Sequence, residues 1–336
     1  MSNRKYYWLL VGGGLLLAGL LFGELMIGPG NLHWTEVLAI LSEHIQQTPA
    51  ANIADTLVWN LRLPRALLAG LIGAALACAG VITQGIFRNP LAAPDVLGIS
   101  SGAALAAVLG FLLQLDGYGI WPIPSIAALG ALAILALLLA LMGQEPQRLR
   151  LLLLGVIVGA WCSAWIALIL ATTTEHWDVS IKIVYWLMGN LEGRTWDHLQ
   201  WFVPPFVLGT ILALWLRNDL DVLQLGHETS ISLGVNLQRL QILSMLTIGL
   251  FVGAATAVSG IIGFIGLIVP HIVRLLIGPG HRQVLPFAAI TGAILMLIVD
   301  MITRSITTIA LPPGVITSLL GAPFFVWILL RNKAAI

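Results

Sequence analysis

Ten apolar runs dominate this sequence, each bounded by charged residues or by clusters of proline and glycine. A helix needs about 20 apolar residues to cross the hydrocarbon core of a bilayer. The runs therefore predict an all-α polytopic membrane protein with about ten transmembrane helices, folded as one transmembrane domain over residues 1–336. They lie at 7–27, 64–84, 95–114, 121–142, 151–171, 200–216, 240–259, 260–276, 285–303 and 314–330.

The balance of residue types excludes most other classes of protein. Of the 336 residues, 59% are hydrophobic and 9% are charged, whereas about 25% are charged in an ordinary soluble domain. A soluble enzyme and a disordered protein are therefore excluded. A formal net charge of +1 leaves no basic surplus for phosphates, so the expected partner is the lipid bilayer and not a nucleic acid.

The stretch 240–273 contains 34 residues without a charge, a length between one span and two. Lysine and arginine decide the matter, because cytoplasmic loops are enriched in both. Two spans, with the N-terminus in the cytoplasm, place eleven of these residues inside and five outside, whereas one span places eight on each side. The break at Ser259-Gly260 also favours two spans. We therefore expect ten spans with both termini in the cytoplasm.

A weak internal repeat links the two halves of the chain. Two sets of residues recur 180 positions apart, namely Gly80, Pro90 and Gly98, then Gly260, Pro270 and Gly278. The first set closes the second predicted span and the later set closes the seventh. An odd number of spans separates them, so the two copies face opposite ways. Inverted repeats of this kind are common in transporters.

Ionisable residues inside the apolar runs are few, and all lie toward span ends: Glu24, His271 and Asp300. We interpret the two carboxylates as interfacial groups that reach water, and the histidine as a hydrogen-bonded packing residue. The lack of an acidic residue near mid-span argues against an ion-coupled secondary carrier. The lack of a mid-span aspartate pair or a serine–histidine dyad argues against an intramembrane enzyme. No catalytic residue, metal site or cofactor is expected.

An energy source for transport is also missing from the sequence. A P-loop requires a lysine directly after a glycine, because that lysine reaches the phosphates. The three lysines are Lys5, Lys182 and Lys333, and none follows a glycine. The chain therefore has the build of a transporter whose ATPase is a separate protein.

The longest predicted cytoplasmic loop, 217–239, has the pattern of two short helices. The first is expected over 220–225, and the second over 228–233, after a break at Gly226. Thr229 and Ser230 are suited to cap the second helix at its N-terminus, and Gly234 at its C-terminus.

This loop carries more apolar surface than a solvated loop needs. The apolar side chains are Leu223, Leu225, Ile231 and Leu233. A docking element for a partner protein is favoured, and a plain structured loop is the alternative.

Two arginines open the second span on the predicted outer side, which is poor in basic residues. They are Arg62 and Arg65, with Pro64 suited to the first helical turn between them. Cations at a helix N-terminus oppose the helix dipole, so helix stability does not explain them. They either anchor the span to lipid headgroups or bind carboxylates of a partner, since arginine is suited to bidentate pairing.

Five motifs together give the chain a clear resemblance over nearly its whole length. They are RLPR at 62–65, QGIFRNPLAAPDVLG at 84–98, LGHETSISLGV at 225–235, FIGLIVPHIVR at 264–274 and LPPGVITSLLGAP at 311–323. With these motifs the sequence resembles the iron-siderophore and vitamin B12 permease family of bacterial ABC importers, whose membrane subunit has ten helices and lies in the inner membrane.

The resemblance implies a set of partners and sites. A pair of permeases, either two copies or a copy with a paralogue, would bind two ATP-binding subunits beneath and a periplasmic substrate-binding protein above. The segment 219–236 matches the family's ATPase-coupling loop. The residues expected to act in coupling are Leu223, Gly226, Ser230, Leu233 and Gly234. Arg62, Arg65 and Arg304 match outer arginines that receive carboxylates from the binding protein.

The resemblance leaves the cargo open. An iron(III)-siderophore or a similar metal chelate is favoured, with cobalamin, haem and oxyanions such as molybdate as alternatives. One departure is Ala310, where the family usually has an acidic residue before LPxG. We expect this departure to change a local contact at the outer end of the last span and not the fold.

Overall fold

The computed structural model describes residues 3–28, 32–48, 52–142, 148–173, 175, 177–306 and 311–331, and over these residues it contains helices and no strands. Ala310 and Lys333 lie outside the described residues. Ten helices correspond to the ten predicted spans. They are α1 (Asn3–Met26), α4 (Leu63–Phe87), α5 (Ile99–Leu112), α6 (Pro122–Leu141), α7 (Arg148–Thr172), α9 (Trp196–Leu223), α11 (Leu237–Ser259), α12 (Ile265–Ile277), α13 (His281–Ser305) and α14 (Pro313–Arg331).

Shorter helices connect the spans. They are α2 (Trp34–Ile45), α3 (Ile53–Asp55), the π-helix η1 (Thr56–Arg62), the 3₁₀ helices η2 (Pro94–Leu97) and η3 (Leu115–Tyr118), α8 (Trp177–Leu187) and α10 (His227–Ser232). In the described part of the chain, seven helices are long and apolar enough to cross a membrane alone, and three apolar helices are shorter. The two together confirm the all-α fold with about ten membrane helices.

Two of the shorter membrane helices, α5 and α12, begin inside the bundle after segments that are not α-helical. At about 1.5 Å per residue, α5 with 14 residues and α12 with 13 extend only about 20 Å. Residues 88–98 precede α5 and residues 260–264 precede α12, and these segments cover the rest of the distance across the membrane. Gly260 has φ +71° and ends α11, which confirms that 240–273 forms two spans. Such broken helices are tolerated where protein covers the freed backbone groups.

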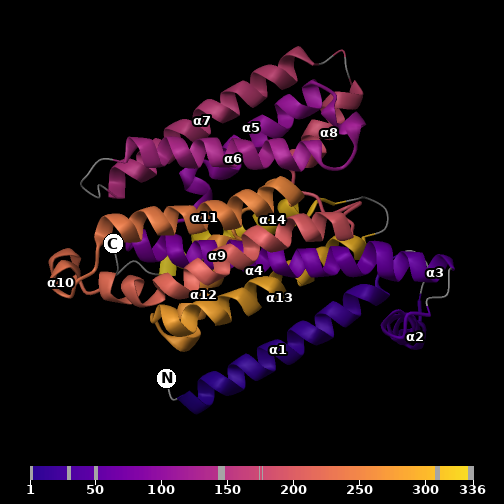
Figure 1. The fold of residues 1–336 in the computed structure, drawn as a ribbon, viewed down its shortest axis with the longest axis horizontal. Coiled ribbons are helices and arrows are strands. Elements are labelled where there is room, and N and C mark those ends of the chain that lie inside the picture. Colours follow the sequence, from indigo (N-terminus) through magenta and orange to yellow (C-terminus); the bar gives the residue numbers. More distant parts are fainter. Residues whose placement is uncertain are drawn as a thin grey trace.

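The bundle has two ends, which we call the α10 end and the arginine end. α4 runs from the arginine end to the α10 end, and α13 runs back (Figure 1). Tyr6 Oη donates to the Gln283 carbonyl at the start of α13, so α1 begins at the α10 end. Phe324 and Phe325 line a small cavity with Pro90, so α14 finishes there too. The chain thus starts and finishes its described spans at one end of the bundle.

α4 forms the centre of the bundle, and glycines bring its backbone against two other helices. At Gly73 a Cβ atom would come within 2.6 Å of the Met296 Cβ on α13, and it would also collide with the Gly292 carbonyl. At Gly80 a Cβ would overlap the backbone of Gly266 on α12. These close approaches require glycine and make α4, α12 and α13 one tightly packed unit.

The inverted repeat is present, but the residue correspondence predicted from sequence is wrong. α4 followed by α5 corresponds to α11 followed by α12, and the two pairs run in opposite directions, with α4 against α12 and α11 against α5. Gly80 lies inside α4, whereas Gly260 terminates α11. α4 ends at Phe87 and α11 ends at Ser259, so the matching helices are offset by less than 180 positions, and an offset of 180 aligns residues that are not equivalent.

The two cysteines form no disulfide. Cys78 and Cys162 are both buried free thiols, which are packing residues within the bundle.

Candidate functional site

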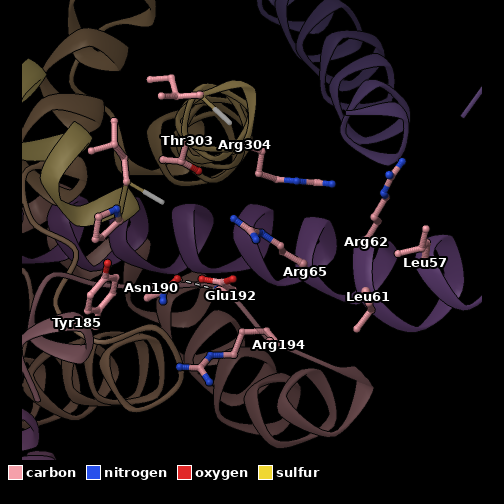
Figure 2. A pocket seen from close by; sticks show the side chains of 14 residues that line it. Leu57, Leu61, Arg62, Arg65, Tyr185, Asn190, Glu192, Arg194, Thr303 and Arg304 are labelled. Atoms are coloured by element: carbon pink, nitrogen blue, oxygen red, sulfur yellow. Dashed lines mark hydrogen bonds between the residues drawn. The ribbon is translucent and has the colours of Figure 1, made fainter. Parts of the chain in front are cut away.

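A cavity of about 510 Å³ opens at the arginine end, and arginines dominate its polar lining. Figure 2 shows Arg62, Arg65, Arg194 and Arg304 around it. They come from η1, α4, the loop after α8, and α13, so three distant parts of the sequence meet here. Tyr185, Asn190, Glu192 and Thr303 also line the cavity. The structure therefore brings together the three arginines predicted to bind a partner.

Each of these three arginines has an internal partner. Arg65 holds Asp300 in a bidentate pair, with Nε to Oδ2 at 2.9 Å and Nη2 to Oδ1 at 2.8 Å. Arg304 Nη1 donates to the Glu24 carboxylate at 2.6 Å and to the Glu24 carbonyl at 3.0 Å. Arg62 Nη1 donates to the carbonyls of Leu25 at 2.8 Å and Met26 at 3.3 Å, at the end of α1.

The expectation that Glu24 and Asp300 reach water is wrong. Both residues are 0% exposed. The two carboxyl groups can be buried this deeply because each is held by an arginine, which offsets the cost of removing it from water. Sequence position near the end of a span suggested an interfacial group, and it carried no information about the helix that packs against that end.

Arg194 is a fourth cation of this end, and it lies outside the sequence motifs that carry the family resemblance. Burial, and then the charge of Arg65, lower the pKa of Arg194 to about 10. Its guanidinium still carries a proton at neutral pH. Glu192, two residues earlier, is exposed. The four guanidiniums outnumber the carboxyl groups beside them, which are those of Glu24, Asp300 and Glu192, so the cavity favours an anionic group.

At the α10 end, the local helix pattern differs from the prediction. The expected helix over 220–225 is the last part of α9, which continues to Leu223. α10 starts at His227, and its N-terminal capping position is Gly226, with φ +124°. Thr229 and Ser230 both lie within α10, so their predicted capping role is wrong. Gly234, with φ +85°, follows the helix as expected.

The residues predicted for coupling divide into a buried set and an exposed set. Leu223 is 2% exposed and Ser230 is 0% exposed. Ser230 Oγ donates to the Val222 carbonyl at 3.1 Å, so it fixes α10 against α9. Leu225, Ile231 and Leu233 are 64%, 56% and 60% exposed. These three form an apolar surface at the tip of the bundle, and we call it the α10 surface.

A further acidic residue, Asp95, lies partly buried within the bundle. Asp95 lies in η2, next to Pro94, which packs against Gly266 beside the middle of α4. Ser100 Oγ donates to Asp95 Oδ1 at 3.4 Å. In the sequence, Asp95 is the first residue of the apolar run 95–114, a position typical of a span end. A broken helix places that end inside the bundle.

Comparison with known proteins identifies the family. The profile of the FecCD transport family matches residues 15–331. This chain belongs to that family. An ABC transporter permease protein of Bacillus subtilis, YvrB, is 38% identical over 99% of this chain and 96% of its own length. The Fe(3+) dicitrate transport system permease protein FecD of Escherichia coli is 41% identical over 81% of this chain and 84% of its own.

Other relatives within the FecCD family differ in their named cargo. The haemin transport system permease protein HmuU of Yersinia pestis is 40% identical over 84% of this chain and 86% of its own. Further relatives are named for import of vitamin B12 and molybdate. A solved structure described as an inward-facing conformation of a putative metal-chelate type ABC transporter has TM-score 0.82 and 33% identity, covering 97% of this chain and 99% of its own.

The chain is therefore a multi-pass membrane permease subunit of an ABC importer of the FecCD family. Permeases of this family work with ATP-binding subunits. Family membership argues against the ion-coupled secondary carrier and the intramembrane enzyme considered from the sequence.

Proposed function

We propose that this permease translocates an iron(III)-siderophore, or a similar metal chelate, across the bacterial inner membrane. Both termini lie in the cytoplasm in this proposal. The observation that carries the cargo class is the similarity, over 97% of the chain, to a transporter of metal-chelate type. The relatives named for iron dicitrate and haemin also handle iron complexes.

The proposed assembly contains two permeases, either identical or paralogous, with two ATP-binding subunits and a periplasmic substrate-binding protein. The permease itself hydrolyses no ATP. The segment 219–236 is the docking element for the ATP-binding subunits, with the α10 surface as its contact. Leu223 and Ser230 support α10 from beneath, and Gly226 and Gly234 allow the chain to turn on either side of it.

At the opposite end, Arg62, Arg65 and Arg304 are proposed to bind carboxylates of the substrate-binding protein. Their internal bonds use part of their capacity, since a guanidinium has five N–H donors. The side chains of Arg65 and Arg304 are still 17% and 10% exposed at the cavity. A carboxylate entering the cavity would thus add to an existing network, and a partner reaches it without breaking the pairs with Asp300 and Glu24.

Vitamin B12, haem and molybdate are the competing cargoes, because relatives of similar identity carry those names. The cavity residues do not select among them. All would be delivered by a binding protein and driven by ATP, so the choice affects the cargo and not the machinery.

The decisive experiment is purification of the permease with the ATP-binding subunit and binding protein encoded beside it, followed by reconstitution in vesicles. Cargo bound to the binding protein would be identified by mass spectrometry and metal analysis. We expect an iron chelate and ATP-dependent uptake of it. Haem, cobalamin, molybdate or a metal-free cargo would contradict the cargo assignment. Uptake driven by an ion gradient without the ATP-binding subunit would contradict the whole proposal.

A further inference from the structure

The last turn of α9, directly before α10, is bound to the first residue of α13. Asp221 Oδ1 accepts two hydrogen bonds from His281, one from its backbone N–H and one from ring Nδ1, each at 2.7 Å. The backbone N–H groups at the start of a helix lack partners within the helix. Asp221 therefore caps α13 from another helix, with a negative charge at the positive end of the helix dipole.

The end of α4 packs against the contact between Asp221 and His281 from the other side. The His281 side chain is 1% exposed, and a Cβ at Gly85 would lie 2.6 Å from its Nε2. Gln224, just after α9, donates to the Gly85 carbonyl at 3.0 Å. α9, α4 and α13 are thus fixed to one another at the point where the chain turns into α10.

α13 runs from this contact to the opposite end of the bundle. With 25 residues it extends about 37 Å. Gly73 and Gly292 bring α4 and α13 into backbone contact at mid-length. Near the far end Asp300 is held by Arg65, and Arg304 is held by Glu24. The α4–α13 pair therefore has fixed contacts at the α10 end, in its middle and at the arginine end.

We propose that Asp221 is a positioning residue that transmits movement of α10 to α13 and, through the α4–α13 pair, to the arginine cluster. The inference rests on the proposed function, in which α10 meets the ATP-binding subunits and the arginines meet the binding protein. Packed interfaces of this kind move as units and do not deform continuously. Loss of the contact between Asp221 and His281 should therefore weaken the energetic coupling between the α10 end and the arginine end.

The test measures the coupling itself. The permease complex with its ATP-binding subunits is placed in lipid nanodiscs, and the Kd of the binding protein is measured with and without ATP. Coupled sites alter each other's affinity, typically by about 5- to 150-fold. In Asp221→Ala the ATP-dependent change should fall below about twofold. Asp221→Asn retains an acceptor oxygen without the charge, and charge-assisted bonds are the stronger ones, so it should give an intermediate ratio.

Asn218→Ala is the matched control, because Asn218 is an exposed residue of α9 one turn before Asp221 and should retain the wild-type ratio. If Asp221→Ala does not assemble, Asp221→Asn carries the test. A wild-type ratio in whichever of these variants assembles overturns the role of Asp221. A wild-type complex whose binding-protein affinity ignores ATP also overturns the inference, whereas the proposed function is overturned by uptake without the ATP-binding subunit, so the two failures are distinct.

Discussion

Arg65 and Asp300 form a bidentate ion pair across 235 residues of chain. The carboxylate is fully buried, and the arginine side chain is 17% exposed at the edge of the cavity. The pair joins the start of α4 to the end of α13. Its first role is therefore structural, and a partner carboxylate would be added to an arginine that already has one.

This pairing predicts a large loss of stability in Asp300→Ala. Removing one member of a buried pair leaves an uncompensated charge and costs about 3–5 kcal/mol. We expect a lower thermal unfolding temperature in detergent, and recovery of part of the loss in the charge swap Arg65→Asp with Asp300→Arg. Asp178→Ala, at an exposed aspartate of α8, is the control. An unfolding temperature of wild-type value in Asp300→Ala would contradict the structural role.

The pair also changes how partner docking must be tested. Arg65→Glu would place a carboxylate next to Asp300, so lost transport in that variant reports repulsion inside the permease. Charge reversal belongs on the binding protein, where Glu→Arg changes should weaken association at the arginine cavity. Exposed pairs contribute about 0–1 kcal/mol each, so several reversals are needed together. Equal binding by the reversed protein, measured on immobilised permease, would exclude docking at this cavity.

Gly73→Ala should destabilise the contact between α4 and α13. The added Cβ would collide with the Gly292 carbonyl and lie 2.6 Å from the Met296 Cβ, and overpacking of this kind costs about 1–3 kcal/mol. Gly14→Ala on α1 is the control, because nothing lies within 4 Å of its added Cβ. The two variants are compared by thermal unfolding. Equal unfolding temperatures would show that α4 and α13 can separate without penalty.

Leu233→Asp tests the α10 surface. Leu233 is 60% exposed, so the change should leave insertion and folding intact. Burial of the new charge against the ATP-binding subunits would be costly, and a loss of about 1.4 kcal/mol lowers the affinity tenfold. Co-purification of the ATP-binding subunit, quantified by blot, measures the effect. Gln238→Asp, at an exposed position of α11, should co-purify normally, and equal recovery with both variants would refute docking on α10.

Membrane orientation can be tested directly. The excess of basic residues at one side predicts that both termini are cytoplasmic. A reporter that is active only in the periplasm should be silent when fused to the C-terminus. The same reporter fused after Gly193, in the arginine-end loop, should be active. The reverse pattern would place the α10 end outside the cell and remove its proposed contact with ATP-binding subunits.

The positions of the membrane helices followed from the sequence. Apolar length is a local property, and the bilayer requires it of each span separately. The separation of α11 from α12 also followed, because Gly260 adopts a left-handed φ that favours glycine. Family motifs located Arg62, Arg65 and the α10 segment in the same way, since those residues are recognised by type and spacing.

What each of these residues touches was decided only by the tertiary structure. Glu24 reads as an interfacial carboxylate until α13 is placed against the end of α1 and supplies Arg304. Asp95 reads as a span boundary until a broken helix carries it into the bundle. Asp221 reads as one more polar loop residue until His281, 60 positions later, is found bound to it. Burial and pairing depend on which helices are neighbours, and neighbours in this bundle are set by backbone packing at glycines such as Gly73 and Gly292, over distances that no local pattern of residues records.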